Sequence, residues 1–183
     1  MVKDSRQLKK IELELTKLGY EKEKTQADAQ YAGEFIRYEK TIEENFRVSM
    51  DILIGKVSDR LSKAVFEAGW IFENSQVRTL RGKTIFEELK VRIIDIGALI
   101  AMKISSCRAT DIRDVFMMEP GMKNPQWIKE EVKKRTDLAQ RVNKLIEKVE
   151  SKQFKDGLGE VYGNVEPKVF EKHRKELNKL KEE

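Results

Sequence analysis

An aspartate in an apolar, strand-like run is the first residue of this sequence that could do chemistry. Asp51 stands in the segment Ser-Met-Asp-Ile-Leu-Ile-Gly, with apolar residues on both sides. Burying a carboxylate in such a strand costs free energy unless the carboxylate binds a cation or a metal ion. Two interpretations follow. Asp51 is either a functional, metal-binding carboxylate or an aspartate at a sheet edge that faces solvent or pairs with a nearby lysine or arginine.

A second group of charged residues follows in the segment Lys-Ile-Ser-Ser-Cys-Arg-Ala-Thr-Asp-Ile-Arg-Asp, which runs from Lys103 to Asp114. Asp111 and Asp114 are spaced to share one face of a helix. Acidic residues are also favoured in the first turn of a helix by its dipole. One interpretation places Lys103 or Arg108 on a phosphate group. The other pairs these cations with the two carboxylates, so that the ion pairs hold two helices together.

The remaining reactive residue types favour structural roles. His173 is the single histidine and lies in register with apolar residues, which predicts a packed side chain. Cys107 has no base beside it in the sequence, so we expect a buried thiol. The glycines from Gly157 to Gly163 do not follow a strand and lack the lysine pattern of a phosphate-binding loop, which predicts a connecting loop.

The elements that would position these residues begin with a helix and a hairpin. Apolar residues recur at helical spacing from Leu8 to Leu18, with Asp4 or Ser5 as the cap and Gly19 at the end. Two strand-like runs follow at 34–38 and 46–54, and their charged connector predicts an antiparallel hairpin.

Helices dominate the later part of the sequence. We expect a short helix at 58–68, a strand and turn at 78–82, a strand at 90–94, a helix capped by Asp95, a short helix capped by Thr110, one long amphipathic helix at 127–149, and a last helix from Pro167. This pattern predicts an α+β fold. Gly121 and Pro125 mark a boundary, so we expect a core at 1–120 and a helical C-terminal extension at 121–183.

The order of four segments resembles a known superfamily. A helix ending in Leu-Gly-Tyr precedes a strand with Met-Asp-Ile-Leu, then Asp-Ile-Gly-Ala-Leu-Ile-Ala-Met-Lys, then Arg-Ala-Thr-Asp-Ile-Arg-Asp. This order is similar to the nucleotidyltransferase superfamily, in particular to the branch related to abortive-infection toxin nucleotidyltransferases. The resemblance covers about residues 4 to 118.

The resemblance implies a mixed sheet packed with helices and a metal-dependent transfer of a nucleotidyl group from a nucleoside triphosphate. Family members use three carboxylates to hold divalent cations beside the nucleotide, so Mg²⁺ is the implied cofactor. Asp51 matches the third of these carboxylates, which implies a catalytic and metal-binding role. The matching of Lys103, Arg108, Asp111 and Asp114 to the family's pocket implies that they bind the nucleotide.

The sequence departs from the family pattern before Asp51. The family's Gly-Ser turn and Asp-x-Asp pair do not occur there, which predicts a truncated start or a degenerate member. One carboxylate binds Mg²⁺ poorly, so we expect this chain to be inactive by itself. A core without its first strand would expose a sheet edge and part of an apolar face, which predicts a homodimer.

Composition limits the compartment and the partners. Charged residues make up 38% of the chain, and its formal net charge is +5. The region from Lys123 to Glu183 has 16 basic and 12 acidic residues, so its charges are mixed and nucleic-acid binding is not predicted. A single cysteine fits a reducing compartment. The longest apolar stretch is interrupted by Asp95 and is too short to span a bilayer, which predicts a soluble, cytoplasmic protein.

Two functions therefore follow from the sequence. The first is a nucleotidyltransferase-like protein or a nucleotide-binding remnant of that activity. The second is a non-catalytic interaction or scaffold protein that keeps the fold and dimerises, using its amphipathic helical tail or an open sheet edge. A third, RNA binding through the basic tail, is the least favoured because the charges there are mixed.

Overall fold

The computed structural model describes residues 1–23, 35–84, 86–163 and 165–181. These residues form two compact units. The first consists of Met1–Ser58 and Val65–Glu73, and the second of Asp59–Ala64 and Asn74–Glu183. Each unit has its own apolar core, and the two are described in turn.

The first unit opens with helix α1 (Ser5–Lys17), as the sequence predicts. Asp4 caps it, because the Oδ1 atom accepts hydrogen bonds from the backbone amides of Arg6 (2.9 Å) and Gln7 (3.0 Å). Leu18 is the C-cap, and Gly19 follows with φ at +80°, a conformation that favours glycine.

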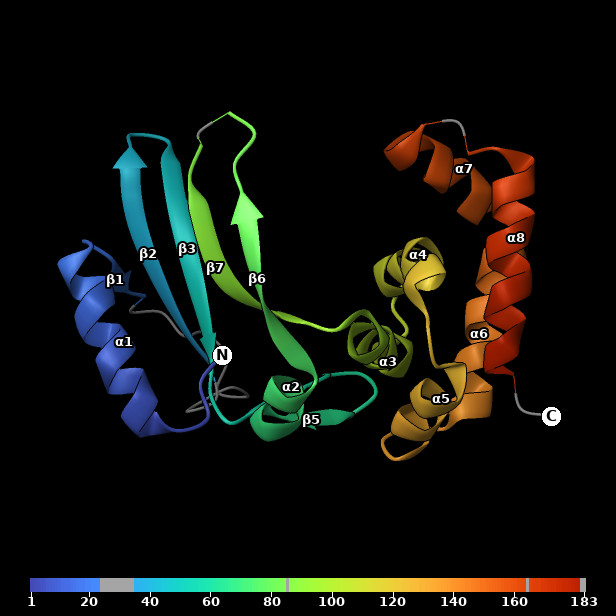
Figure 1. Cartoon of the computed structure of the whole chain (residues 1–183), viewed down its shortest axis with the longest axis horizontal. Helices are drawn as coiled ribbons and strands as arrows, with labels where there is room; N and C mark the ends of the chain where they lie inside the picture. Colours follow the sequence, from blue (N-terminus) through green and yellow to red (C-terminus); the bar gives the residue numbers. More distant parts are fainter. Residues whose placement is uncertain (24–34, 85, 164, 182–183) are drawn as a thin grey trace. The chain divides into compact units, whose positions relative to one another are not determined.

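A three-stranded antiparallel sheet packs against α1 (Figure 1). Its strands are β1 (Glu21–Lys22), β2 (Phe35–Glu43) and β3 (Phe46–Leu53). The predicted hairpin is confirmed, although Glu34 at its start lies outside the described residues. Alternation along the strands directs Ile36 and Ile52 into the core. Arg37 follows Ile36 and Asp51 precedes Ile52, so both side chains point to the opposite face of the sheet.

The predicted helix at 58–68 is wrong. Strands β4 (Lys56–Ser58) and β5 (Val65–Glu67) form an antiparallel pair there, and helix α2 (Ala68–Glu73) follows. The turn that joins the strands explains the difference. The Oδ1 atom of Asp59 accepts hydrogen bonds from the amides of Leu61 (3.2 Å) and Ser62 (2.8 Å), and Lys63 has φ at 61°. These local bonds replace the helical ones that the apolar spacing suggests.

The second unit contains a two-stranded antiparallel ribbon and a group of helices. Strands β6 (Ser75–Arg81) and β7 (Glu88–Ile94) pair along their whole length. The predicted strand at 90–94 lies inside β7. We call this pair of strands the β6–β7 ribbon.

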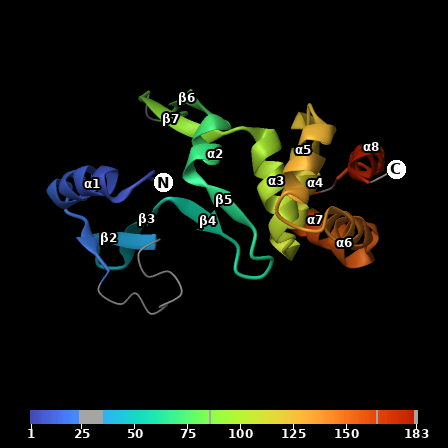
Figure 2. The same ribbon diagram turned by 90° about the horizontal axis from the view of Figure 1, so that it is seen from below.

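The helices of the second unit lie together in both views (Figures 1 and 2). Their bounds are α3 (Ile96–Ser106), α4 (Ala109–Met118), α5 (Pro125–Lys133), α6 (Leu138–Glu150), α7 (Lys152–Tyr162) and α8 (Pro167–Leu177), with 3-10 turns at Glu119–Gly121 and Asn178–Leu180. Phe116 of α4 lies in their common core. Its ring centroid is 5.3 Å from Phe154, 5.0 Å from Phe170 and 5.2 Å from His173. Residue 120 therefore lies within this unit, where α3 and α4 share one core with the helices that follow.

Three details of the helical region differ from the sequence prediction. The single helix expected at 127–149 is two helices, because Asp137 caps α6 by accepting from the amide of Gln140 (2.9 Å). The loop expected from Gly157 to Gly163 is instead mostly helix α7. Helix α4 begins at Ala109, so the N-cap is Arg108 and not Thr110. The apolar spacing continues across the first break, and only the capping side chain marks it.

The α+β class and the helical C-terminal region are confirmed. The described strands form three antiparallel sheets, and Val2 and Ile54 make an isolated parallel bridge. Among the described residues, none of the helices combines the length and the apolar character that crossing a bilayer requires.

Candidate functional site

Asp51 belongs to the first unit, where it is paired with Arg37 of β2. The two residues lie directly opposite each other in the ladder between β2 and β3. Arg37 Nε lies 2.7 Å from Asp51 Oδ1, and Arg37 Nη2 lies 3.1 Å from Oδ2. These hydrogen bonds, followed by the charge of Asp51, raise the pKa of the Arg37 guanidinium. Both oxygens of Asp51 are thus engaged by one guanidinium, as in the pairing interpretation of the sequence.

The residues around Asp51 do not fit a magnesium site. Mg²⁺ requires near-octahedral oxygen coordination, usually with carboxylates that are open to the metal. Both carboxylate oxygens of Asp51 accept from Arg37. Across the part of the chain that the structure describes, no group of three or more His, Cys, Asp or Glu side chains is placed to hold a metal ion. The surroundings of Asp51 therefore differ from those that the metal-binding interpretation requires.

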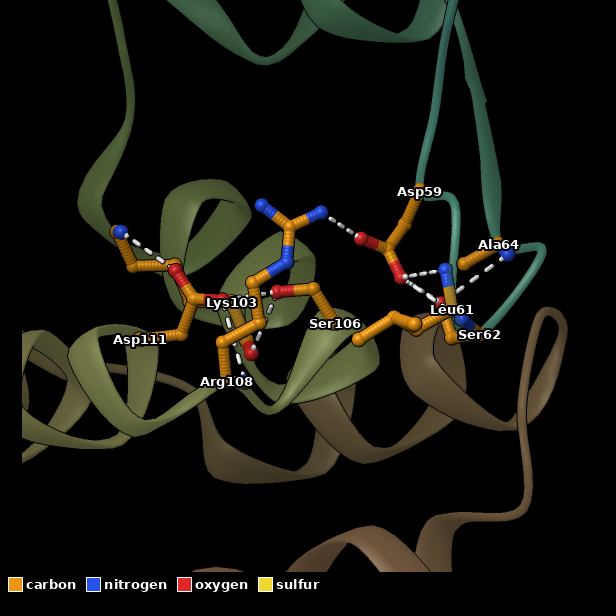
Figure 3. A network of polar contacts seen from close by, with 8 residues as sticks. All are labelled: Asp59, Leu61, Ser62, Ala64, Lys103, Ser106, Arg108 and Asp111. Carbon is orange, nitrogen blue, oxygen red and sulfur yellow. Dashed lines mark hydrogen bonds and ion pairs between the residues drawn. The ribbon is translucent and has the colours of Figure 1, made fainter.

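The other four residues selected from the sequence lie in the second unit, where α3 meets α4. Figure 3 shows Lys103, Arg108 and Asp111. Lys103 lies near the end of α3 and contacts two carboxylates of α4. Its Nζ atom is 3.0 Å from Asp111 Oδ1 and 2.7 Å from Asp114 Oδ2. The spacing of the two aspartates on one helix face brings both to the same ammonium group.

The carboxylate of Asp111 is enclosed by further donors. Its Oδ2 atom accepts from the Ser106 hydroxyl and from the Arg108 backbone amide (3.3 Å). Burial alone would raise the pKa of Asp111, but the hydrogen bonds from Ser106 and Lys103 together lower it. Burial would lower the pKa of Lys103, yet the bonds to Asp114 and Asp111 raise it. Lys103 thus remains a charged ammonium and is unsuited to accept a proton as a base.

Arg108 is paired with Asp59, a carboxylate outside the set selected from the sequence. Its guanidinium contacts Asp59 Oδ2 (Figure 3). The other oxygen of Asp59 accepts from the amides of Leu61 and Ser62 and from the Ser62 hydroxyl (2.8 Å). Burial would raise the pKa of Asp59, but these bonds and Arg108 lower it. The pair joins the Asp59–Ala64 segment to the first turn of α4.

The arrangement supports a structural role for these charges. The structure brings Lys103, Asp111 and Asp114 together and pairs Arg108 with Asp59. Lys103 holds α3 to α4, as the ion-pair interpretation predicts. Each cation that would have to bind a phosphate is already bonded to a carboxylate, so a phosphate would have to displace that bond.

A cavity of about 690 Å³ lies elsewhere in the second unit, where the base of the β6–β7 ribbon meets the starts of α3 and α5. The sequence did not predict it. Its lining residues come from three separate stretches of the sequence: Asn74, Gln76, Arg78, Ile93, Ile94, Asp95, Ile96, Gly97, Ala98, Gly121, Lys123, Asn124 and Trp127. No periodicity or motif connects Arg78 with Lys123, and no pattern in the sequence indicates that they line one cavity.

Comparisons with protein-family models, with curated proteins and with solved structures found no match to this chain. Its function is therefore inferred from the residues and their geometry.

Proposed function

We propose that this protein is a non-catalytic interaction protein that binds an acidic, extended segment of a partner protein on one face of the β6–β7 ribbon. The observation that carries the proposal is the exposed apolar face of this ribbon. The pairing of Asp51, Lys103 and Arg108 with neighbouring charges supports the non-catalytic part, because none of these groups is available without breaking an ion pair.

The register between β6 and β7 defines the two faces of the ribbon. Residues directly opposite each other share a face, and successive residues alternate. One face carries the pairs Gln76–Ile93, Arg78–Val91 and Leu80–Leu89. The other carries the pairs Ser75–Ile94, Val77–Arg92, Thr79–Lys90 and Arg81–Glu88. The first face is the more apolar, and we call it the apolar face of the ribbon.

The apolar face is open to solvent in the described structure. Leu80 is 49% exposed, Leu89 is 62% exposed and Ile93 is 39% exposed. An antiparallel sheet with such alternation ordinarily buries its apolar side against a core. An isolated two-stranded ribbon is also marginally stable in water. A partner that covers this face would remove apolar area from water and stabilise the ribbon.

Charge indicates which partner fits. Residues 75–94 contain five basic and two acidic side chains. Arg78 lies on the apolar face itself, whereas Lys90 and Arg92 lie on the other face of the ribbon. A partner segment with acidic residues complements this surface, whereas a basic segment is repelled. Among the described residues, strand β6 pairs only with β7, so an extended segment could also extend the sheet along its outer edge.

The same charges disfavour a second copy of this chain as the occupant. Two copies related by a two-fold axis through the centre of the apolar face would bring Arg78 close to its symmetry mate. Antiparallel pairing of two β7 strands centred on Val91 would place Lys90 opposite Arg92. Like charges directly opposite each other destabilise a strand pair. The homodimer predicted from the sequence therefore needs a different surface.

The helical tail is a weaker candidate surface than the sequence predicts. Its apolar stripe includes Val142 and Leu145 of α6, and both side chains are buried within the second unit. Phe170 and Leu177 of α8 are buried in the same core. These residues hold the helices to one another and are not available for a partner.

A designed peptide tests the proposal. The probe is an extended peptide in which valine and leucine alternate with glutamate, and its matched control carries lysine in place of glutamate. Fluorescence anisotropy should show binding of the acidic peptide alone, weakened about tenfold by Leu89→Asp. Leu13→Asp is the matched protein control, because Leu13 on α1 is 59% exposed and lies in the first unit.

Three results would contradict the proposal. The two peptides could bind equally, or Leu13→Asp could weaken binding as much as Leu89→Asp does. Light scattering could also reveal a dimer that Leu89→Asp dissociates, in which case a second copy occupies the ribbon.

A further inference from the structure

We propose that the cavity at the base of the β6–β7 ribbon binds a small organic anion, in which a phosphate or carboxylate group is joined to a flat apolar ring. This site adjoins the partner surface proposed above, and Gln76, Arg78 and Ile93 border both. Its volume of about 690 Å³ lies within the usual range for small-molecule sites, roughly 300–1,000 Å³.

Two cationic side chains line the cavity. Arg78 comes from β6, and Lys123 comes from the segment before α5. Within the described ranges, neither side chain makes an ion pair or hydrogen bond. Lys103 and Arg108 differ, because each is bonded to a carboxylate of the same unit. Arg78 and Lys123 can therefore bind an anion at the cavity without breaking an ion pair of the described structure.

The carboxylate that also lines the cavity is already engaged. Asp95 Oδ1 accepts a hydrogen bond from Gln76 Nε2 at 2.5 Å. Asp95 occupies the N-cap position of α3, but its side chain makes no capping hydrogen bond. The amides of Gly97 and Ala98 in the first turn therefore have no side-chain acceptor from the cap residue. They line the cavity and would add to the attraction that the two cations exert on an anion.

Part of the cavity wall is apolar and includes Ile96 and Trp127. A Cβ atom on Gly97 would lie 3.6 Å from Trp127 Cζ3. A Cβ atom on Gly121 would lie 2.7 Å from Ile96 Cδ1, so the end of the Ile96 side chain would have to move to admit it. Gly121 thus lets Ile96 lie close to the backbone, and Trp127 lies within ordinary contact distance of Gly97. A flat apolar ring fits such a wall and would contact the indole of Trp127.

The indole also provides the measurement. The chain has two tryptophans, and Trp70 lies in the first unit, so Trp70→Phe leaves Trp127 as the only indole. Phenyl phosphate is titrated into the full chain carrying this substitution, and Trp127 fluorescence is recorded. Benzoate tests the carboxylate form of the ligand. Inorganic phosphate and phenol test the charged group and the ring separately.

We expect saturable quenching by phenyl phosphate, by benzoate, or by both, and much weaker effects of phosphate and phenol. Arg78→Gln and Lys123→Gln should each weaken binding about tenfold, since a charge-assisted hydrogen bond is lost. Lys83→Gln removes a cation from the exposed turn between β6 and β7, outside the cavity, and should change nothing. Circular dichroism checks that each variant is folded.

The proposal is overturned by an absence of saturable quenching, by equal binding of phenol or inorganic phosphate, or by an equal loss in Lys83→Gln. Failure of the small-anion proposal can be distinguished from failure of the proposal that an acidic segment binds the ribbon. Leu89→Asp should leave phenyl phosphate binding intact, because Leu89 does not line the cavity. Lys123→Gln should leave the acidic peptide bound, because Lys123 lies outside the ribbon.

Discussion

Arg37 and Asp51 face each other across strands β2 and β3, and the guanidinium engages both carboxylate oxygens, at 2.7 and 3.1 Å. This bidentate geometry is the strongest form of such a pair. It also places one guanidinium on both oxygens of Asp51, so a metal ion would have to compete with that cation.

The first prediction concerns Asp51→Asn. We expect a small loss of stability in this variant, and the same loss in Arg37→Gln, because the two side chains are partly exposed and act on each other. The double variant should lose no more than either single one. Urea denaturation of all four proteins measures this coupling. Mg²⁺ should leave the thermal midpoint unchanged. A midpoint that Mg²⁺ raises in the original chain but not in Asp51→Asn would restore the metal-binding role.

The second prediction concerns Lys103→Met. Removing the ammonium leaves the largely buried Asp111 beside Asp114 with no cation between them, so the free energy of unfolding should fall by about 2 kcal/mol. Adding Asp111→Asn should recover part of that loss. Lys144→Met on α6 is the control, because Lys144 is exposed. If Lys103 served a bound phosphate instead of the α3–α4 contact, Lys103→Met would be as stable as Lys144→Met.

The third prediction concerns the buried carboxylate of Glu119, whose side-chain Oε2 has no hydrogen-bond partner among the described residues. Burial raises the pKa of Glu119, although the charge of His173 opposes this. Because its pKa is raised in the folded state, the neutral form of Glu119 favours folding. This contribution is complete below the unfolded-state pKa of glutamate, about 4.3, and is lost as the pH rises through the folded-state pKa. Glu119→Gln should therefore increase the free energy of unfolding at pH 7 by about 1 kcal/mol.

The gain from Glu119→Gln should shrink as the pH is lowered, since the native glutamate becomes neutral as well. Urea unfolding of the variant and the original chain at a series of pH values measures the difference. Glu147→Gln, at an exposed glutamate of α6, should show neither the gain nor its pH dependence. A gain that is constant from pH 7 down to pH 4 would rule out ionisation of Glu119 as its cause.

Local patterns predict part of this fold well. The apolar spacing and the Asp4 cap are sufficient to predict α1, and the alternation of apolar and polar residues is sufficient to predict the hairpin of β2 and β3. Both elements form through contacts between residues that are near one another in the sequence. The turn at Asp59 and the break before Asp137 were missed for one reason. A single side chain that bonds to nearby amides overrides an apolar pattern extending through it.

The site residues divide in the same way. The contact of Lys103 with Asp111 and Asp114 could be predicted as one of two alternatives, since helix spacing places the carboxylates together. The partner of Arg108 could not be predicted, because Asp59 is distant in sequence. The cavity bordered by Arg78 and Lys123 depends on how the ribbon meets the helices, and no local rule specifies that junction. The nucleotidyltransferase relationship stays a prediction.

The course of the backbone has a practical consequence for dissecting this protein. The Asp59–Ala64 segment belongs to the second unit, while the residues before and after it belong to the first. A fragment that starts at Asn74 would keep every helix from α3 onward but lose Asp59, so Arg108 would have no carboxylate to bind. No single proteolytic cut can therefore release either unit whole, and truncation is a poor way to assign a function to one of them.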